Sequence, residues 1–134
     1  MKITQLSVFL ENRSGRLNEI THILSSAGVN LDAFCLAEAN DFGILRMVVS
    51  DAERAKSVLR EHNIAARTTE VICLECPNEP GQMGKILDRL AERGVFIEYM
   101  YAFSRGSVAN VVIRPTDIEA CCCVLGMMDQ RITK

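Results

Sequence analysis

Residues 77–87, PNEPGQMGKIL, combine a turn sequence that ends at Gly81 with the start of an apolar helical pattern. Residues 11–21, ENRSGRLNEIT, place Gly15 at the corresponding point before a similar pattern. A single turn of this kind needs no further explanation. Two of them in a chain of 134 residues indicate that the same small unit is present twice.

Shifting the sequence by 66 positions aligns the two turns and keeps the register without a gap. A long period with two copies is typical of a duplicated module, because a solenoid needs three or more stacked units. The identical pairs include Asn12 with Asn78, Gly15 with Gly81, Ile20 with Ile86, Leu24 with Leu90, Gly28 with Gly94, Val29 with Val95, Asp51 with Asp117, Glu53 with Glu119, Val58 with Val124 and Leu59 with Leu125.

Each copy contains the periods of strands and helices in the same order. In copy one, Leu6, Val8 and Leu10 alternate as in a strand, and residues 17–27 have the apolar spacing of a helix of about three turns. A hairpin follows, and the capping-box pattern SDAE at residues 50–53 predicts the start of a second helix. A last strand then leads directly into copy two.

This order, with right-handed crossovers, predicts an α+β fold of two tandem ferredoxin-like βαββαβ modules. Each antiparallel sheet would carry both of its helices on one face. We expect the modules at residues 1–70 and 71–134. Because the sequence ends at Lys134, residues 129–133, DQRIT, supply only a short last strand in this prediction.

The repeated loop leads into the N-terminus of a helix, where up to four backbone N–H groups lack partners and the helix dipole is positive. Such a position attracts an anion, and Gly15 and Gly81 leave the backbone open to one. Pro80 suits a first helical position, since its missing N–H would be unpaired there. The alternative interpretation is that Asn, Pro and Gly simply start a helix well.

The pattern Asn-x-Pro-Gly at residues 78–81, followed by Met83, Ile86, Leu90 and Gly-Val-x-Ile at residues 94–97, resembles the ACT domain, a small amino-acid-sensing module. Residues 12–31 of copy one resemble it as well. The resemblance covers essentially the whole chain, which is therefore similar to stand-alone proteins of two tandem ACT domains.

The resemblance implies binding of a free amino acid or a similar small effector where two modules meet. In such a site the strand-to-helix loop of one module receives the α-carboxylate and amino group, and the second strand of a neighbouring module helps to close the pocket. By position, the candidates in copy one are Asn12, Arg13, Ser14, Gly15 and Leu17 with Asn30 and Leu31, and those in copy two are Asn78, Glu79, Pro80, Gly81, Gln82 and Met83 with Phe96 and Ile97.

The two loops depart from the family pattern in different ways. Asn12 and Asn78 stand where an acidic residue is common, which weakens the expectation of a charge contact to the ligand's amino group. Ser14 replaces the proline of the pattern, and Arg13 in copy one aligns with Glu79 in copy two. We therefore expect the two loops to differ in affinity.

The bulk properties argue against charged polymers as partners. Fifteen Lys and Arg against seventeen Asp and Glu give a net charge of -2, with no block of like charge. Neither a nucleic-acid surface nor a polybasic membrane surface is indicated. The first residues lack the apolar run of a secretory signal, so we expect a cytoplasmic protein. No pattern indicates a cofactor.

Six cysteines raise the question of a metal or disulfide site. Cys73 and Cys76 have metal-knuckle spacing, but residues three apart on a strand point to opposite faces. Cys121 aligns with the core position Ala55, which favours burial over metal or redox chemistry. We therefore read the cysteines as reduced thiols and predict no metal site.

Tyr99, Tyr101 and Phe103 share one face of a predicted strand, an arrangement that RNA-binding ferredoxin-like domains use to stack bases. The following strand, SVANVVIRP, has no aromatic residue and a single Arg, so a core or a subunit interface is the better interpretation. We predict that the chain forms a homodimer or that its modules pack on each other.

No catalytic site is predicted. His22 and His62 do not recur between the copies and lack a nucleophile in their sequence context, so we expect them to be solvated. Arg13 as the anion clamp of a small phosphoanhydride hydrolase remains a minor alternative. The main prediction is a regulatory protein that binds an amino acid, and the second is a regulatory subunit that acts mainly through contact with a biosynthetic enzyme.

Overall fold

The computed structural model describes residues 1–11, 13–39 and 41–132, which form six strands and four helices. The elements follow the order that the sequence predicts, except that two successive predicted strands form the single strand β4 and that the chain ends in a helix. They are β1 (Lys2–Glu11), α1 (Arg16–Ser26), β2 (Leu31–Ala39), β3 (Phe42–Val49), α2 (Ala52–Glu61), β4 (Ala66–Pro77), α3 (Gln82–Glu92), β5 (Ile97–Arg105), β6 (Val108–Pro115) and α4 (Ile118–Ile132).

The chain divides into two compact units. The first module comprises residues 4–70, and the second module comprises residues 71–134 together with residues 1–3. β1 and β4 each contribute to both modules, because each of these strands crosses a boundary between them. The last strand of copy one and the first strand of copy two are thus one continuous strand.

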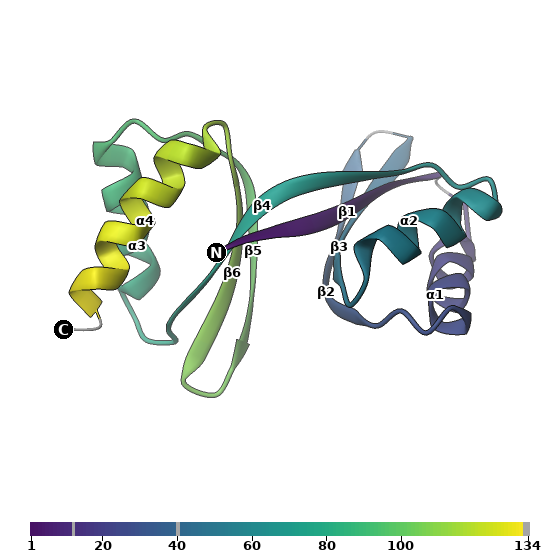
Figure 1. The fold of residues 1–134 in the computed structure, drawn as a ribbon, viewed down its shortest axis with the longest axis horizontal. Coiled ribbons are helices and arrows are strands. Elements are labelled where there is room, and N and C mark those ends of the chain that lie inside the picture. Colours follow the sequence, from purple (N-terminus) through teal and green to yellow (C-terminus); the bar gives the residue numbers. More distant parts are fainter. Residues whose placement is uncertain (12, 40, 133–134) are drawn as a thin grey trace. The chain divides into compact units, whose positions relative to one another are not determined.

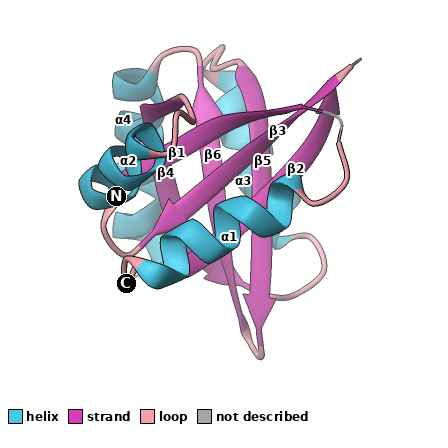
Figure 2. Cartoon of the chain, turned by 90° about the vertical axis from the view of Figure 1, so that its right-hand side faces the viewer, coloured by secondary structure: helices cyan, strands magenta, loops and turns pink. Residues whose placement is uncertain are grey.

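The first module has the strand order β2-β3-β1-β4, with β1 and β2 both antiparallel to β3. Leu6 lies opposite Met47, and Val8 lies opposite Leu45, so both pairs face the same side. Figures 1 and 2 show α1 and α2 on one side of these strands. The core between them contains Leu6, Val8, Leu10, Ile20, Leu24, Val29, Leu45, Met47, Val49, Ala55, Leu59 and Ile64.

The second module repeats this arrangement with β4, β6 and β5, and Figure 1 shows α3 and α4 side by side. Cys121 of α4 and Ala55 of α2 are both fully buried, as their alignment predicts. The predicted fold class, two ferredoxin-like modules, is confirmed. This second core contains Ile72, Cys76, Ile86, Leu90, Val95, Ala109, Val111, Ile113, Cys121, Val124 and Leu125.

The prediction of a short last strand at residues 129–133 is wrong. Residues 129–132 continue α4, and residue 133 lies outside the described residues. The start of β1 takes the vacant sheet edge instead, because the N–H of Cys73 donates to the carbonyl of Met1 at 2.9 Å and the amino group of Met1 donates back at 3.3 Å. A segment distant in sequence thus completes the second sheet.

The capping box predicted at residues 50–53 is also wrong in detail, although α2 begins where expected. The side chain of Asp51 caps α2 by accepting from the N–H of Arg54 at 3.1 Å. The hydroxyl of Ser50 is used elsewhere, since it accepts from the N–H of Asn30 at 2.8 Å. Asp117 caps α4 in the same way, accepting from the N–H of Ala120 at 3.1 Å.

Candidate functional site

The two loop-to-helix junctions have the same backbone geometry. Gly15 precedes α1 with φ 87° and ψ -7°, and Gly81 precedes α3 with φ 87° and ψ -12°. Both conformations are left-handed, where residues with a Cβ are strained, so glycine is required by the backbone alone. Among the described residues no side chain caps either helix, which leaves backbone N–H groups of the first turn open to a ligand.

The space in front of both glycines is open. A Cβ added to Gly15 or Gly81 would meet no atom within 4 Å among the described residues. Arg13, Ser14, Glu79 and the other exposed loop residues therefore border a surface that faces solvent within each module. An anion can reach the helix N-terminus there.

Pro80 does not occupy the first position of a helix, contrary to the sequence prediction. α3 begins at Gln82, and the left-handed Gly81 separates it from Pro80. The loop therefore makes a separate turn before the helix starts, in which the N–H of Gln82 donates to the carbonyl of Glu79 at 3.3 Å. The N–H of Arg16 likewise donates to the carbonyl of Arg13 at 3.3 Å, so both loops contain this turn.

Asn78 is engaged within the fold. Its side-chain amide donates to the carbonyl of Gly106 at 3.1 Å, and its backbone N–H donates to the carbonyl of Ser107 at 2.8 Å. These bonds attach the loop to the turn between β5 and β6, so the amide nitrogen of Asn78 is used within the fold. The corresponding Asn12 lies outside the described residues.

Arg16 is a charged residue at the first loop that the sequence analysis missed. It opens α1, and its side chain is only 17% exposed. One guanidinium nitrogen, Nη1, contacts the Glu19 carboxylate at 2.9 Å, while Nε is buried and has no hydrogen-bond partner among the described residues. The alignment of the two copies could have indicated Arg16, because it pairs this charged residue with the neutral Gln82.

Leu17 and Met83 lie at the boundary between loop and core. Both side chains are half-buried, and each packs against the core of its own module. They therefore hold the first helical turn in place. A ligand at either helix N-terminus would have an apolar surface beside it.

Within one module, the predicted ligand-binding residues at the second strand do not lie beside the strand-to-helix loop. Asn30 and Leu31 follow the C-terminal end of α1, whereas Gly15 precedes its N-terminal end. Eleven helical residues separate them, a length of about 16 Å. Phe96 and Ile97 stand in the same relation to Gly81 across α3. The two parts of each predicted site are therefore separated within their own module.

The predicted ligand-binding residues Asn30 and Phe96 accept equivalent backbone hydrogen bonds in the two modules. The N–H of Ser50 donates to the carbonyl of Asn30 at 3.0 Å, and the N–H of Thr116 donates to the carbonyl of Phe96 at 2.9 Å. The side chains differ, since the Asn30 amide donates to Asp32 at 2.7 Å while Phe96 is 67% exposed. The duplication therefore preserves the backbone and varies the surface.

The cysteines form no metal site in the described part of the chain, where no group of three or more possible ligands occurs. Cys73 lies opposite Val112 and Cys76 lies opposite Ala109, an odd separation that places the two thiols on opposite faces of β4. Burial raises the pKa of Cys73, and burial together with the neighbouring Cys122 raises the pKa of Cys121 to about 11. Such thiols stay protonated and unreactive at neutral pH.

The model of a family described as the ACT domain pair matches residues 1–129. The chain belongs to the ACT domain pair family. Its repeated loops are therefore the strand-to-helix loops of two ACT domains, and its regulatory character follows from the family. A search of curated proteins gives no match to this ACT domain pair.

Several solved structures share the fold of this chain. A protein from Bacteroides thetaiotaomicron is 49% identical, with a TM-score of 0.93 over 96% of this chain and 90% of that one. The ligand-free regulatory subunit of aspartate kinase from Thermus thermophilus shares the fold, with 14% identity, a TM-score of 0.68 and coverage of 95% and 94%. Aspartokinase III of E. coli, in complex with lysine and aspartate, has 14% identity and a TM-score of 0.61, with coverage of 99% and 32%.

None of the helices in the described residues has the length and apolar character needed to cross a membrane.

Proposed function

We propose that this ACT domain pair is a cytoplasmic regulatory protein, not an enzyme, that binds a free amino acid or a similar small carboxylate at its strand-to-helix loops. The observation that carries the proposal is the matched geometry of Gly15 and Gly81, each followed by a helix N-terminus that no described side chain caps. Unpaired N–H groups and a positive dipole end favour a carboxylate at this position.

In this proposal the ligand contacts come from the loop residues of one module and the second strand of a neighbouring one. The neighbour is either the other module of the chain or a module of a second copy. The proposed contacts are those predicted from the sequence: Asn12, Arg13, Ser14, Gly15 and Leu17, Asn30 and Leu31, Asn78, Glu79, Pro80, Gly81, Gln82 and Met83, Phe96 and Ile97.

The first loop is the better carboxylate site. Arg13 and Arg16 place two guanidinium groups at or beside the N-terminus of α1, whereas the second loop has Glu79 and Gln82 at these positions. The second loop would repel a carboxylate through Glu79 or favour the amino group of the ligand. We therefore propose that one loop dominates binding.

Regulation would follow from linkage. A ligand held between modules stabilises the arrangement of modules that it binds best, and a partner enzyme that senses that arrangement responds. The second candidate function, a subunit that acts mainly through protein contact, is favoured by Phe34 and Leu36, which are 60% and 51% exposed on the edge strand β2. We propose that this strand joins two copies in a homodimer.

A thermal-shift panel of the twenty common amino acids tests the proposal. A true ligand at 100 times its dissociation constant adds about 2.7 kcal/mol to the free energy of unfolding. If no amino acid raises the unfolding temperature, the amino-acid proposal is contradicted. The second candidate function, a subunit that acts mainly through protein contact, is then favoured. Light scattering of the wild type and Phe34→Lys tests the dimer, with Val108→Lys as the exposed control on β6.

A further inference from the structure

A second candidate site lies away from the loops, at the C-terminal end of α2. There a cleft of about 380 Å³ opens on the surface of the first module. This volume falls within the range of small-molecule sites. The lining residues are Lys56, Arg60, Asn63, Ile64, Ala65 and Ala66.

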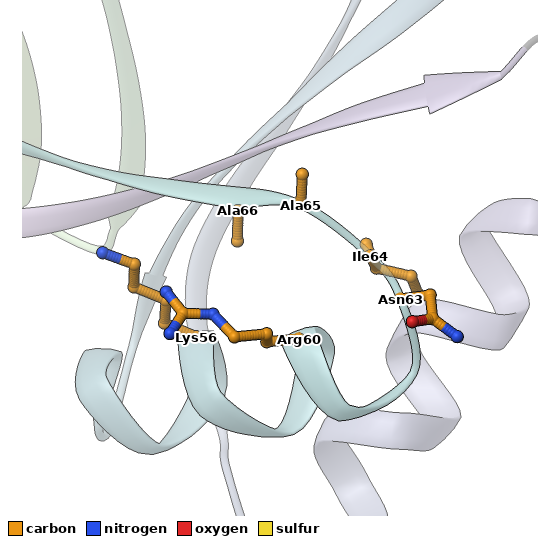
Figure 3. Close-up of a pocket in the computed structure, with 6 residues that line it drawn as sticks. All are labelled: Lys56, Arg60, Asn63, Ile64, Ala65 and Ala66. Carbon is orange, nitrogen blue, oxygen red and sulfur yellow. The ribbon is translucent and has the colours of Figure 1, made fainter.

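The two cations of the cleft lie together. Lys56 and Arg60 are one helical turn apart, and Figure 3 shows both side chains extending in the same direction beneath the start of β4. The side chain of Ala66 points toward them, while Asn63 lies at the other end of the cleft. Two like charges at this spacing repel each other, so an anion between them would be stabilised by both.

No acidic side chain neutralises this pair within the described residues. Glu53 and Glu61 of α2 are exposed, and neither forms an ion pair with Lys56 or Arg60 in that part of the chain. The floor of the cleft is apolar, because Ile64 is 4% exposed and belongs to the core. The cleft thus combines two unneutralised cations with a small apolar surface.

The cleft's charge is specific to one copy. The 66-residue alignment sets Lys56 against Cys122 and Arg60 against Gly126, so the second module has no charge at either position. The charge is therefore not part of the duplicated scaffold.

We propose that the cleft at Lys56 and Arg60 binds a small anion that carries two negative charges, a phosphate or a dicarboxylate. Its contacts would be side chains, because the N–H of Asn63 already donates to the carbonyl of Arg60 at 2.9 Å and that of Ile64 donates to the carbonyl of Leu59 at 2.8 Å. The site is independent of the amino-acid site at the loops. Binding would weaken as the salt concentration rises.

Titration of ¹⁵N-labelled protein with inorganic phosphate, and separately with succinate, at constant ionic strength tests the site. The amides of residues 60–66 are expected to shift saturably with one or both anions, and the anion that binds more tightly identifies the chemistry. Lys56→Gln with Arg60→Gln is expected to weaken binding at least tenfold. If the double variant fails to fold, the two single variants are measured instead, and each is expected to weaken binding by an intermediate amount.

The matched control is Lys85→Gln with Arg89→Gln, an exposed pair with the same spacing on α3 that removes the same charge. It is expected to leave binding unchanged. The proposal is overturned if neither anion gives a saturable shift, or if the control pair weakens binding as much as the cleft pair. The amino-acid response at the loops is expected to survive loss of Lys56 and Arg60, so failure of one proposal is distinguishable from failure of the other.

Discussion

The side-chain amide of Asn78 donates a hydrogen bond to the carbonyl of Gly106 at 3.1 Å, which joins the second loop to the tip of a hairpin 28 residues away. We predict that Asn78→Ala lowers the free energy of unfolding by about 1 kcal/mol, the usual net value of one such bond. Urea denaturation measures the change. Glu79→Ala, in the same loop, is the control and is expected to change stability by less than about 0.5 kcal/mol. Equal effects of the two variants would contradict a holding role for Asn78.

The left-handed backbone of Gly81 gives a second prediction. Gly81→Ala places a Cβ in a strained conformation and is expected to cost about 1–2 kcal/mol. Gly84→Ala, one turn later in α3, is the matched control, because Gly84 has ordinary helical backbone and open space for a Cβ. It is expected to stabilise the protein by about 0.4–1 kcal/mol. Thermal unfolding compares the two, and the same sign for both would contradict the assigned geometry.

The junction of Met1 and Cys73 gives a third prediction. A chain that begins at Thr4 loses the edge strand that covers β4 in the second module, so the amide hydrogen of Cys73 is expected to exchange faster with solvent. The amide of Ile64, which donates within the first module to Leu59, is the internal control. Unchanged protection of Cys73 would show that residues 1–3 are not part of this sheet in solution.

The raised pKa of Cys121 gives a fourth prediction, about pH. The pKa of its thiol is 9.0 in the unfolded chain and about 11 in the folded one. Well below pH 9 the thiol is therefore neutral in both states, and it does not make the free energy of unfolding depend on pH. Between these values the unfolded state loses its proton first, and the free energy of unfolding falls as pH rises. Cys121→Ala, which copies Ala55 of the first module, is expected to flatten this part of the pH profile. An identical slope in both proteins would contradict the assignment.

The duplicated register was enough to predict the strand and helix order, the burial of Cys121, which aligns with Ala55, and the two glycine turns. Four features could not be read from it. The pairing of Met1 with Cys73 joins residues 72 positions apart, which no local period indicates. The bond of Asn78 to Gly106 depends on the sheet register, and the burial of Arg16 depends on how its side chain packs. The cleft at Lys56 and Arg60 likewise requires the path of the chain after α2.

The central claim, that a carboxylate binds at the N-terminus of α1, is tested most directly by calorimetry with the amino acid that responds in the thermal-shift panel. Arg16→Gln gives the first loop the residue of the second, whereas Glu19→Gln removes the same ion pair and keeps the guanidinium group. We predict that Arg16→Gln weakens binding about tenfold and that Glu19→Gln does not weaken it. Unchanged affinity in Arg16→Gln, or two sites of identical affinity per chain, would contradict the account.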